Sequence, residues 1–125
     1  MIAENIIPLV VDDSSTMVRI ISNTLKRIGI KKVYTASDGV EGLKEFNSNK
    51  DISIVLTDWN MPNMNGLDLV KAIRKKDEDI PIVMITTEGG KAEVITALKA
   101  GASQYIVKPF DIHTLKIKLQ NILDI

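Results

Sequence analysis

Five polar side chains of this chain each follow closely on an apolar run: Asp12, Asp13, Asp58, Thr86 and Lys108. If the apolar runs are parallel strands of one sheet, their carboxyl ends lie along one edge, and open α/β sheets bind ligands at that edge. Three carboxylates, a hydroxyl and an ammonium group would then converge there. Such a set suits a divalent cation and a phosphoryl group, because carboxylates bind hard cations and a lysine pairs with phosphate.

The three carboxylates are the unfavourable part of this group. They repel one another in a shared pocket unless a cation offsets their charge, and the cation that we expect is Mg²⁺, which prefers oxygen ligands. A simpler interpretation of Asp12 and Asp13 is a helix N-terminus, where acidic residues are favourable, with Ser14 or Ser15 as the cap. Because the chain has no Cys and a single His outside these positions, a zinc or iron site is not indicated.

Lys108 and Thr86 supply the other half of the expected site. Pro109 follows Lys108 and favours an extended conformation for it, so the lysine would be held at a strand end where its charge can pair with a phosphate. The alternative is an ordinary lysine at the edge of the sheet. The Thr86 hydroxyl could cap a turn with Thr87 or bond a phosphoryl oxygen, and these two roles are compatible.

Strand-like and helix-like segments alternate along the chain. The strand-like segments span 6–11, 32–36, 52–56, 82–85 and 105–107. They are almost continuously apolar, which is typical of strands covered on both faces. Gly29 and Gly101 are placed to end helices, whereas Asp38 and Asp111 are placed to begin them. This order predicts an α/β protein in which a parallel sheet of five strands carries five helices on its two faces.

Apolar residues recur at helical spacing between the strands, and this spacing predicts a helix in each of these stretches. Two such sets are Val40, Leu43 and Phe46 in one helix, and Val94, Ile95 and Leu98 in another.

Composition and charge favour one domain over residues 1–125. A chain of 125 residues is long enough to bury a core without disulfides. Sixteen basic residues balance sixteen acidic ones, so no overall field would recruit nucleic acid or a membrane surface. The sequence shows neither the pattern of a signal peptide nor an apolar run long enough to span a membrane. We expect a cytoplasmic protein whose output comes from its own surface.

Four motifs, taken in order, resemble those of the receiver domains of two-component response regulators. They are Val10–Ser14, Thr57–Pro62, Ile85–Glu88 and Tyr105–Phe110, and the likeness runs over nearly the whole chain. Within the family, the run Asp58–Met64 and the closing Lys-Pro-Phe are most similar to the CheY group of stand-alone chemotaxis regulators. The resemblance implies a flavodoxin-like (CheY-like), doubly wound sheet of five parallel strands in the order 2-1-3-4-5, with five helices.

The same resemblance implies roles for the residues at the expected edge. Asp58 would be the phosphoacceptor, which attacks the phosphohistidine of a histidine kinase. Asp13 and Asp58 would bind Mg²⁺ directly, Asp12 would act mainly through water, and Asn60 would contribute its backbone carbonyl. The metal and Lys108 would neutralise the charge that develops on the phosphoryl oxygens, as phosphoryl transfer requires.

A second set of residues would respond to phosphorylation of Asp58 and control how long the phosphorylated state lasts. The resemblance implies that Thr86 moves to bond the phosphoryl group and that Tyr105 turns inward behind it. The alternative for Tyr105 is an aromatic at the sheet edge with its hydroxyl in water. Asn60 and Glu88 would flank the path of the attacking water and tune dephosphorylation.

The resemblance also implies partners. A histidine kinase of the CheA kind would phosphorylate a monomer, the product would bind a FliM-like protein of the flagellar motor switch, and a phosphatase is a further expected partner. The residues that match the motor-binding surface are Lys91, Val94, Tyr105 and Lys118. Two alternatives stay open: a phosphorelay or phosphate-sink receiver without a motor partner, and a Mg²⁺-dependent phosphatase with Asp58 as nucleophile. The second lacks an evident cap domain or substrate pocket.

Overall fold

The structure, a computed structural model, describes residues 3–125. Its strands are β1 (Pro8–Val11), β2 (Tyr34–Ala36), β3 (Ile54–Thr57), β4 (Ile82–Thr86) and β5 (Gln104–Val107). Its helices are α1 (Ser15–Arg27), α2 (Gly39–Ser48), α3 (Gly66–Arg74), α4 (Lys91–Ala100) and α5 (Ile112–Leu123), and a 3₁₀ turn, η1 (Ala3–Asn5), precedes β1. The predicted alternation is confirmed, although β1 and β2 each begin two residues later than the predicted segments 6–11 and 32–36. Within residues 3–125, no helix combines the length and apolar character that crossing a membrane requires.

The strands form one parallel sheet in the order β2-β1-β3-β4-β5, which is the order that the resemblance implied. The register brings the strand ends level with one another. Val11 at the end of β1 pairs with Thr57 at the end of β3. Thr86 at the end of β4 pairs with Val107 at the end of β5. Whatever follows these residues therefore lies along one edge of the sheet.

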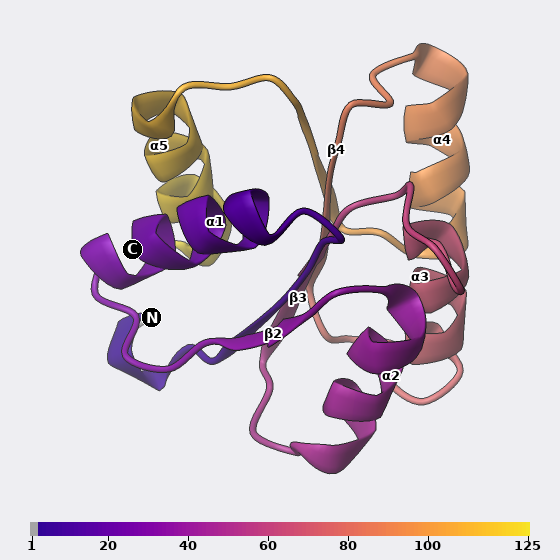
Figure 1. The fold of residues 1–125 in the computed structure, drawn as a ribbon, viewed down its shortest axis with the longest axis horizontal. Helices are drawn as coiled ribbons and strands as arrows, with labels where there is room; N and C mark the ends of the chain where they lie inside the picture. The colour runs from indigo at the N-terminus through magenta and orange to yellow at the C-terminus, as the bar shows by residue number, and fades with distance from the viewer. Residues whose placement is uncertain (1–2) are drawn as a thin grey trace.

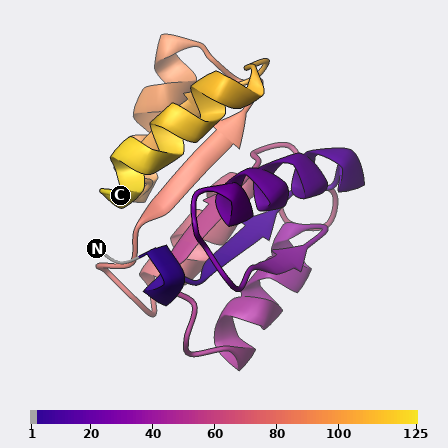
Figure 2. The same ribbon diagram turned by 90° about the vertical axis from the view of Figure 1, so that its left-hand side faces the viewer.

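The sheet separates two apolar layers, because successive residues of a strand face opposite sides. In β1, Val10 packs with α1 and α5, whereas Leu9 and Val11 pack with the helices of the other face. Figure 1 shows the sheet between α1 and α5 on the left and α2, α3 and α4 on the right. Figure 2 shows α5 and α1 together over one face of the sheet. Both faces are covered, which explains why the strands are almost continuously apolar.

Side chains cap four of the five helices at their N-termini. Each of these four accepts a hydrogen bond from the backbone N–H three residues further on: Ser14, Asp38, Asn65 and Asp111. Gly29 and Gly101 follow the ends of α1 and α4 with φ angles of 105° and 121°, a conformation that glycine adopts without strain. The starts and stops predicted at aspartate and glycine are therefore confirmed. Gly90 precedes α4 and provides no side-chain cap.

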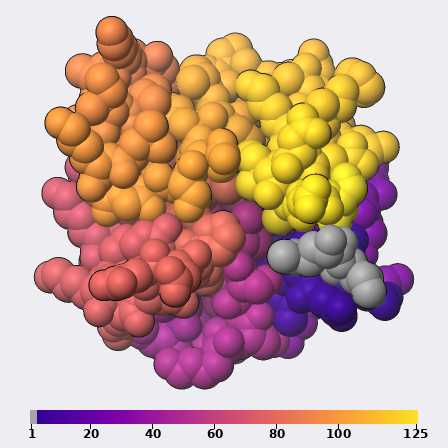
Figure 3. Space-filling model, turned by 180° about the vertical axis from the view of Figure 1, so that it is seen from behind, coloured from indigo at the N-terminus to yellow at the C-terminus, as the bar shows by residue number. Residues whose placement is uncertain are grey.

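Three large apolar side chains of α2 and α4 are exposed. The exposed fraction is 52% for Val40, 41% for Ile95 and 45% for Leu98. Helix α4 packs into the core through the small, fully buried Ala97, which leaves its larger neighbours Ile95 and Leu98 outside. Figure 3 views the molecule from behind, where both α4 in orange and α5 in yellow are visible at the surface.

Candidate functional site

The predicted residues lie at the edge formed by the carboxyl ends of the strands. Asp12 follows β1 and Asp58 follows β3, and their N–H groups extend the sheet by donating to the neighbouring strands at 3.1 and 2.9 Å. Lys108 follows β5, and its N–H donates to the Thr86 carbonyl at 2.8 Å. The sheet itself therefore fixes the backbone from which these three side chains extend.

Three carboxylates and one ammonium group meet at this edge. One oxygen each of Asp12, Asp13 and Asp58 lies within 4.8 Å of the others. Lys108 Nζ is 2.8 Å from Asp12 Oδ2 and 3.4 Å from Asp58 Oδ2. The Asp12 side chain is 2% exposed and that of Asp58 is 12% exposed, whereas Asp13 is open to solvent. The cluster is therefore closed on its Asp12 side and accessible from Asp13.

The carboxyl group of Asp58 experiences opposing influences. Burial raises its pKa above the usual value for Asp, the Lys108 ammonium lowers it, and the charge of Asp12 raises it again. The Trp59 N–H donates to Asp58 Oδ1 at 2.7 Å and favours the charged form, as the Thr86 hydroxyl also does. The pKa remains raised because the effect of burial outweighs the effect of the lysine.

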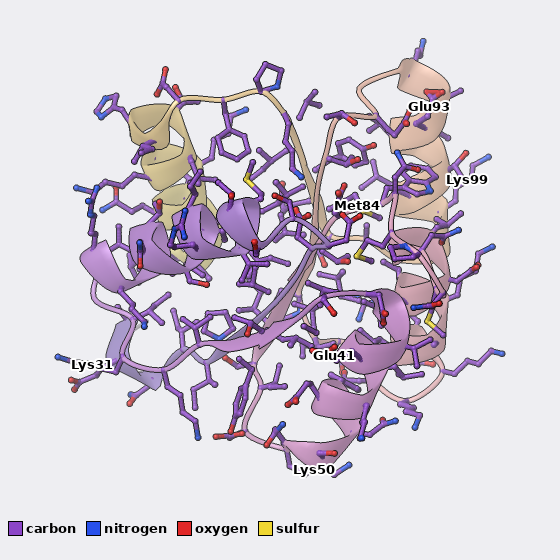
Figure 4. The ribbon with its side chains drawn as sticks, in the orientation of Figure 1. Lys31, Glu41, Lys50, Met84, Glu93 and Lys99 are labelled. Carbon is purple, nitrogen blue, oxygen red and sulfur yellow. The ribbon has the colours of Figure 1, made fainter. Side chains whose placement is uncertain are left out.

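The donor set fits a hard divalent cation. When all four groups are ionised, three negative charges and one positive charge leave a net charge of −2. The donors are carboxylate oxygens, which Mg²⁺ prefers, and the exposed side at Asp13 leaves room for the waters that Mg²⁺ usually keeps. A hollow of about 230 Å³ beside Asp12 and Asp13 is also lined by Glu41. Figure 4 shows Glu41 on α2 and Met84 in the interior of the molecule.

The residues expected to act as the switch and to tune dephosphorylation are joined by hydrogen bonds through Glu88. Its N–H donates to Thr86 Oγ1 at 3.3 Å, and its backbone carbonyl accepts from the Tyr105 hydroxyl. Its side-chain Oε1 accepts from Asn60 Nδ2 at 2.8 Å. The Tyr105 hydroxyl therefore has a protein partner. Burial raises the pKa of Tyr105, with the charges of Glu88 and Glu93 adding to the effect, so the hydroxyl keeps its proton at neutral pH.

The residues expected at the partner surface come from three elements. Lys91 and Val94 lie at the start of α4, Tyr105 lies on β5 and Lys118 lies on α5. Tyr105 and Lys118 line one shallow hollow of about 250 Å³. Lys91 and Val94 do not line this hollow, and Val94 is partly buried. The structure thus brings two of the four expected residues into one depression.

The structure also contains contacts around the site that sequence reasoning missed. Asn63 Nδ2 donates to Asp38 Oδ2 at 2.7 Å, although the two residues are 25 positions apart in sequence. Gly66 lies so close to the backbone that a Cβ there would overlap the carbonyl oxygen of Asp58. The glycine after a polar loop is a signal that could have suggested this close approach. Nothing in the local sequence signals the contact between Asn63 and Asp38.

Comparisons with known proteins agree with this geometry. The sequence model of the response regulator receiver domain matches residues 9–120. The chain belongs to this family. The receiver domain is 62% identical over 117 residues to the chemotaxis protein CheY homolog of Campylobacter jejuni, which covers 92% of this chain and 90% of the relative. It is 61% identical over 117 residues to the chemotaxis protein CheY1 of Helicobacter pylori, with 92% and 94% covered.

Solved structures are similar as well. The chemotaxis response regulator CheY4 of Vibrio cholerae has a TM-score of 0.85 and 35% identity, with 94% of this chain and 98% of that chain covered. A chain of the CheX–CheY–BeF3–Mg complex of Borrelia burgdorferi has a TM-score of 0.87 and 28% identity, with 98% of both chains covered. The sequence-based assignment to the receiver family, its likeness to the CheY group and the predicted strand order are confirmed. The chain is therefore a signalling protein of the response regulator type.

Proposed function

We propose that this receiver domain, residues 1–125, is a chemotaxis response regulator that accepts a phosphoryl group on Asp58 and then binds the flagellar motor switch. The observation that carries the proposal is the position of Asp58: a partly exposed carboxylate beside two others and 3.4 Å from the Lys108 ammonium. This arrangement offers a nucleophile, positive charge and a cation site on one side of the sheet.

In the proposed reaction, an oxygen of Asp58 attacks the phosphorus atom of a kinase phosphohistidine. The new bond joins that oxygen to phosphorus, the phosphorus–nitrogen bond breaks, and the imidazole of the kinase leaves with the electron pair. The Trp59 N–H orients the Asp58 carboxylate through its bond to Oδ1. Lys108 offsets charge on the transferred oxygens. Mg²⁺, held by Asp13, Asp58 and the Asn60 backbone carbonyl, with Asp12 acting through water, would supply further positive charge.

The product is an acyl phosphate, so water can attack it and end the signal. Asn60 and Glu88 would control that water, and the hydrogen bond of 2.8 Å between their side chains supports a joint role. The added phosphoryl group carries about −1.5 to −2 charges. Thr86 would bond this group, and Tyr105, which shares Glu88 as a partner with Thr86, would transmit the change to α4, β5 and α5. The protein would then be a phosphoacceptor with self-limited activity rather than an enzyme acting on an external substrate.

The relatives support the choice of partners. Those from Campylobacter jejuni and Helicobacter pylori are chemotaxis proteins of the CheY type. By analogy, we assign a CheA-like histidine kinase as donor and a FliM-like motor protein as target of a monomeric, cytoplasmic regulator. The Borrelia burgdorferi structure contains CheX together with CheY, BeF3 and Mg, and this supports both a Mg²⁺ site and a phosphatase partner for the present chain.

The proposal is tested by phosphorylating the protein with acetyl phosphate and Mg²⁺ and measuring its affinity for a motor-switch peptide. We expect the affinity to rise on phosphorylation and the rise to be absent in Asp58→Asn. Asp51→Asn, at the opposite end of β3, is the matched control and should behave as wild type. Equal peptide binding with and without the phosphodonor in the wild-type protein would exclude the motor role.

A further inference from the structure

The loop between β3 and α3 contacts the N-terminus of α2 at the level of the backbone. The Gly39 N–H donates to the Met64 carbonyl at 3.0 Å, and a Cβ at position 39 would overlap this oxygen. At the far end of the same loop, the Gly66 N–H donates to the Trp59 carbonyl at 2.8 Å. The loop is therefore closed on itself and also placed against a second element.

Asp38 joins these two elements with its two carboxylate oxygens. Oδ1 accepts from the Glu41 N–H at 2.8 Å and caps α2, whereas Oδ2 accepts from Asn63 Nδ2 at 2.7 Å. The Glu41 N–H and then the Asn63 side chain lower the pKa of Asp38, so the carboxylate is charged at neutral pH. A hydrogen bond to a charged acceptor is stronger than one between neutral groups. Asn63 has a φ of 67°, in the left-handed region that asparagine tolerates.

The position of this loop matters because Asn60 lies in it. In the proposed function Asn60 offers its backbone carbonyl to the cation, and a carbonyl cannot be repositioned by a change of rotamer. Its place is set by the backbone of the loop alone. That backbone is held on one side by the bond between Asn60 and Glu88 and on the other by the bond between Asn63 and Asp38.

We propose that Asp38 and Asn63 are positioning residues for the divalent cation, because the hydrogen bond between them holds the loop and thereby the Asn60 carbonyl beside the carboxylates. This inference rests on the proposed function, which places the cation at that cluster. Neither side chain touches the reacting atoms, so both act through the loop. Groups that support metal ligands typically change metal affinity 10- to 100-fold, and for this pair, which is not deeply buried, we expect about tenfold.

The deciding variant is Asn63→Gly. Glycine adopts the φ of 67° without strain and leaves the charge unchanged while removing the side chain that bonds Asp38, and the double variant with Asp38→Ser separates the lost bond from the added freedom of the glycine backbone. In a titration followed by Trp59 fluorescence, the Mg²⁺ dissociation constant should rise about tenfold relative to wild type. Asp38→Ser keeps a capping hydroxyl for α2 and removes Oδ2. Adding Asn63→Gly to Asp38→Ser should change the dissociation constant little further, since the same bond is already absent.

Asp51→Ser is the matched control, because it removes another surface carboxylate that bonds Lys32 and Tyr34 away from this loop. It should leave the Mg²⁺ dissociation constant unchanged. Urea unfolding of the metal-free proteins separates a loss of stability from a loss of metal affinity. If Asn63→Gly unfolds more easily but binds Mg²⁺ within about twofold of wild type, the inference is overturned while the proposed function stands. If the wild-type protein itself does not bind Mg²⁺, both are overturned.

Discussion

Asn60 and Glu88 form a side-chain hydrogen bond of 2.8 Å between the loop after β3 and the loop after β4. The two residues follow Asp58 and Thr86 at the same spacing of two positions. Their contact therefore connects the loop of the proposed phosphoacceptor with the loop of the proposed switch. In the proposed function, Glu88 flanks the path of the water molecule that attacks the phosphoryl group.

Two substitutions of Glu88 should separate the effect of its charge from that of its hydrogen bond. Glu88→Gln keeps an oxygen for Asn60 and removes the charge, whereas Glu88→Ala removes both. An exposed unit charge about 4 Å from an anion contributes about 1 kcal/mol, so both variants should react with acetyl phosphate up to about fivefold faster. Only Glu88→Ala should also change the rate of dephosphorylation. Both rates are followed by Trp59 fluorescence, and identical dephosphorylation of the two variants would contradict a role for the hydrogen bond.

The raised pKa of Asp58 predicts a pH-dependent effect on stability. Burial is the main cause, with Asp12 adding to it and Lys108 opposing it. In the unfolded state the pKa of an Asp carboxyl is about 3.9. A carboxyl whose pKa is higher than this in the folded state stabilises the protein at pH values below the unfolded pKa. It loses that contribution as the pH rises through the folded pKa. Asp58→Asn should therefore be more stable than wild type at pH 7 without Mg²⁺. Urea unfolding should show this difference shrinking as the pH is lowered towards about 4.

Asp51 provides the control of opposite sign. Its bond to Lys32 is the main cause that lowers its pKa, so its carboxylate contributes stability above the unfolded pKa and loses it as pH falls through the folded pKa. Asp51→Asn should therefore be no more stable than wild type at pH 7. A gain in stability for both variants would show that the effect of Asp58 does not come from its local surroundings.

Removing the Lys108 ammonium should destabilise the metal-free protein. The Asp12 carboxylate is 2% exposed and has Lys108 Nζ at 2.8 Å, so Lys108→Met would leave a buried charge without its partner. Breaking such a pair costs about 3 kcal/mol or more. Saturating Mg²⁺ should narrow the gap, because Lys108→Met removes a positive charge beside the carboxylates and should therefore bind the cation, and be stabilised by it, more strongly than wild type. Lys108→Arg, which retains the charge, is the control in the same urea experiment. If the difference in stability between Lys108→Met and wild type has the same size with Mg²⁺ as without it, that result would argue against a cation at this cluster.

The sequence could predict the part of the site that is formed by residues at the ends of strands. Asp12, Asp58 and Lys108 follow apolar strands directly, so the parallel register alone brings them to one edge. The contact between Asn63 and Asp38 could not be predicted in the same way. It depends on a positive φ within a loop and on the approach of a second loop, and neither has a periodic sequence signal.

The fold shows the same contrast between strong and weak signals. Continuous apolar strands and the caps Asp38 and Asp111 could be recognised because each depends on residues close together in sequence. The orientation of α4 could not, since its apolar residues do not define one face. Ala97 is buried in the core, whereas Ile95 and Leu98 are exposed. The tertiary packing of the helix, and not its local sequence, determines which of its residues are buried.

Ser22 on α1 offers a prediction unconnected with phosphorylation. Its hydroxyl is buried and finds no hydrogen-bond partner in the part of the chain that the structure describes, residues 3–125. A buried hydroxyl without a partner costs about 1–3 kcal/mol, and alanine is also the better helix former. Ser22→Ala should therefore stabilise the protein by about 1 kcal/mol in urea unfolding.

The control for Ser22 lies two positions further along the same helix. Thr24 is also buried, but its hydroxyl donates to the Ile20 carbonyl at 2.8 Å. Thr24→Val keeps the shape of the side chain and removes a satisfied group, so it should destabilise the protein by about 1 kcal/mol. Opposite signs for the two variants would follow from the pairing of the hydroxyl, because both hydroxyls lie on the same helix and only that of Thr24 has a partner. A loss of stability in Ser22→Ala would mean that the Ser22 hydroxyl is hydrogen-bonded in solution.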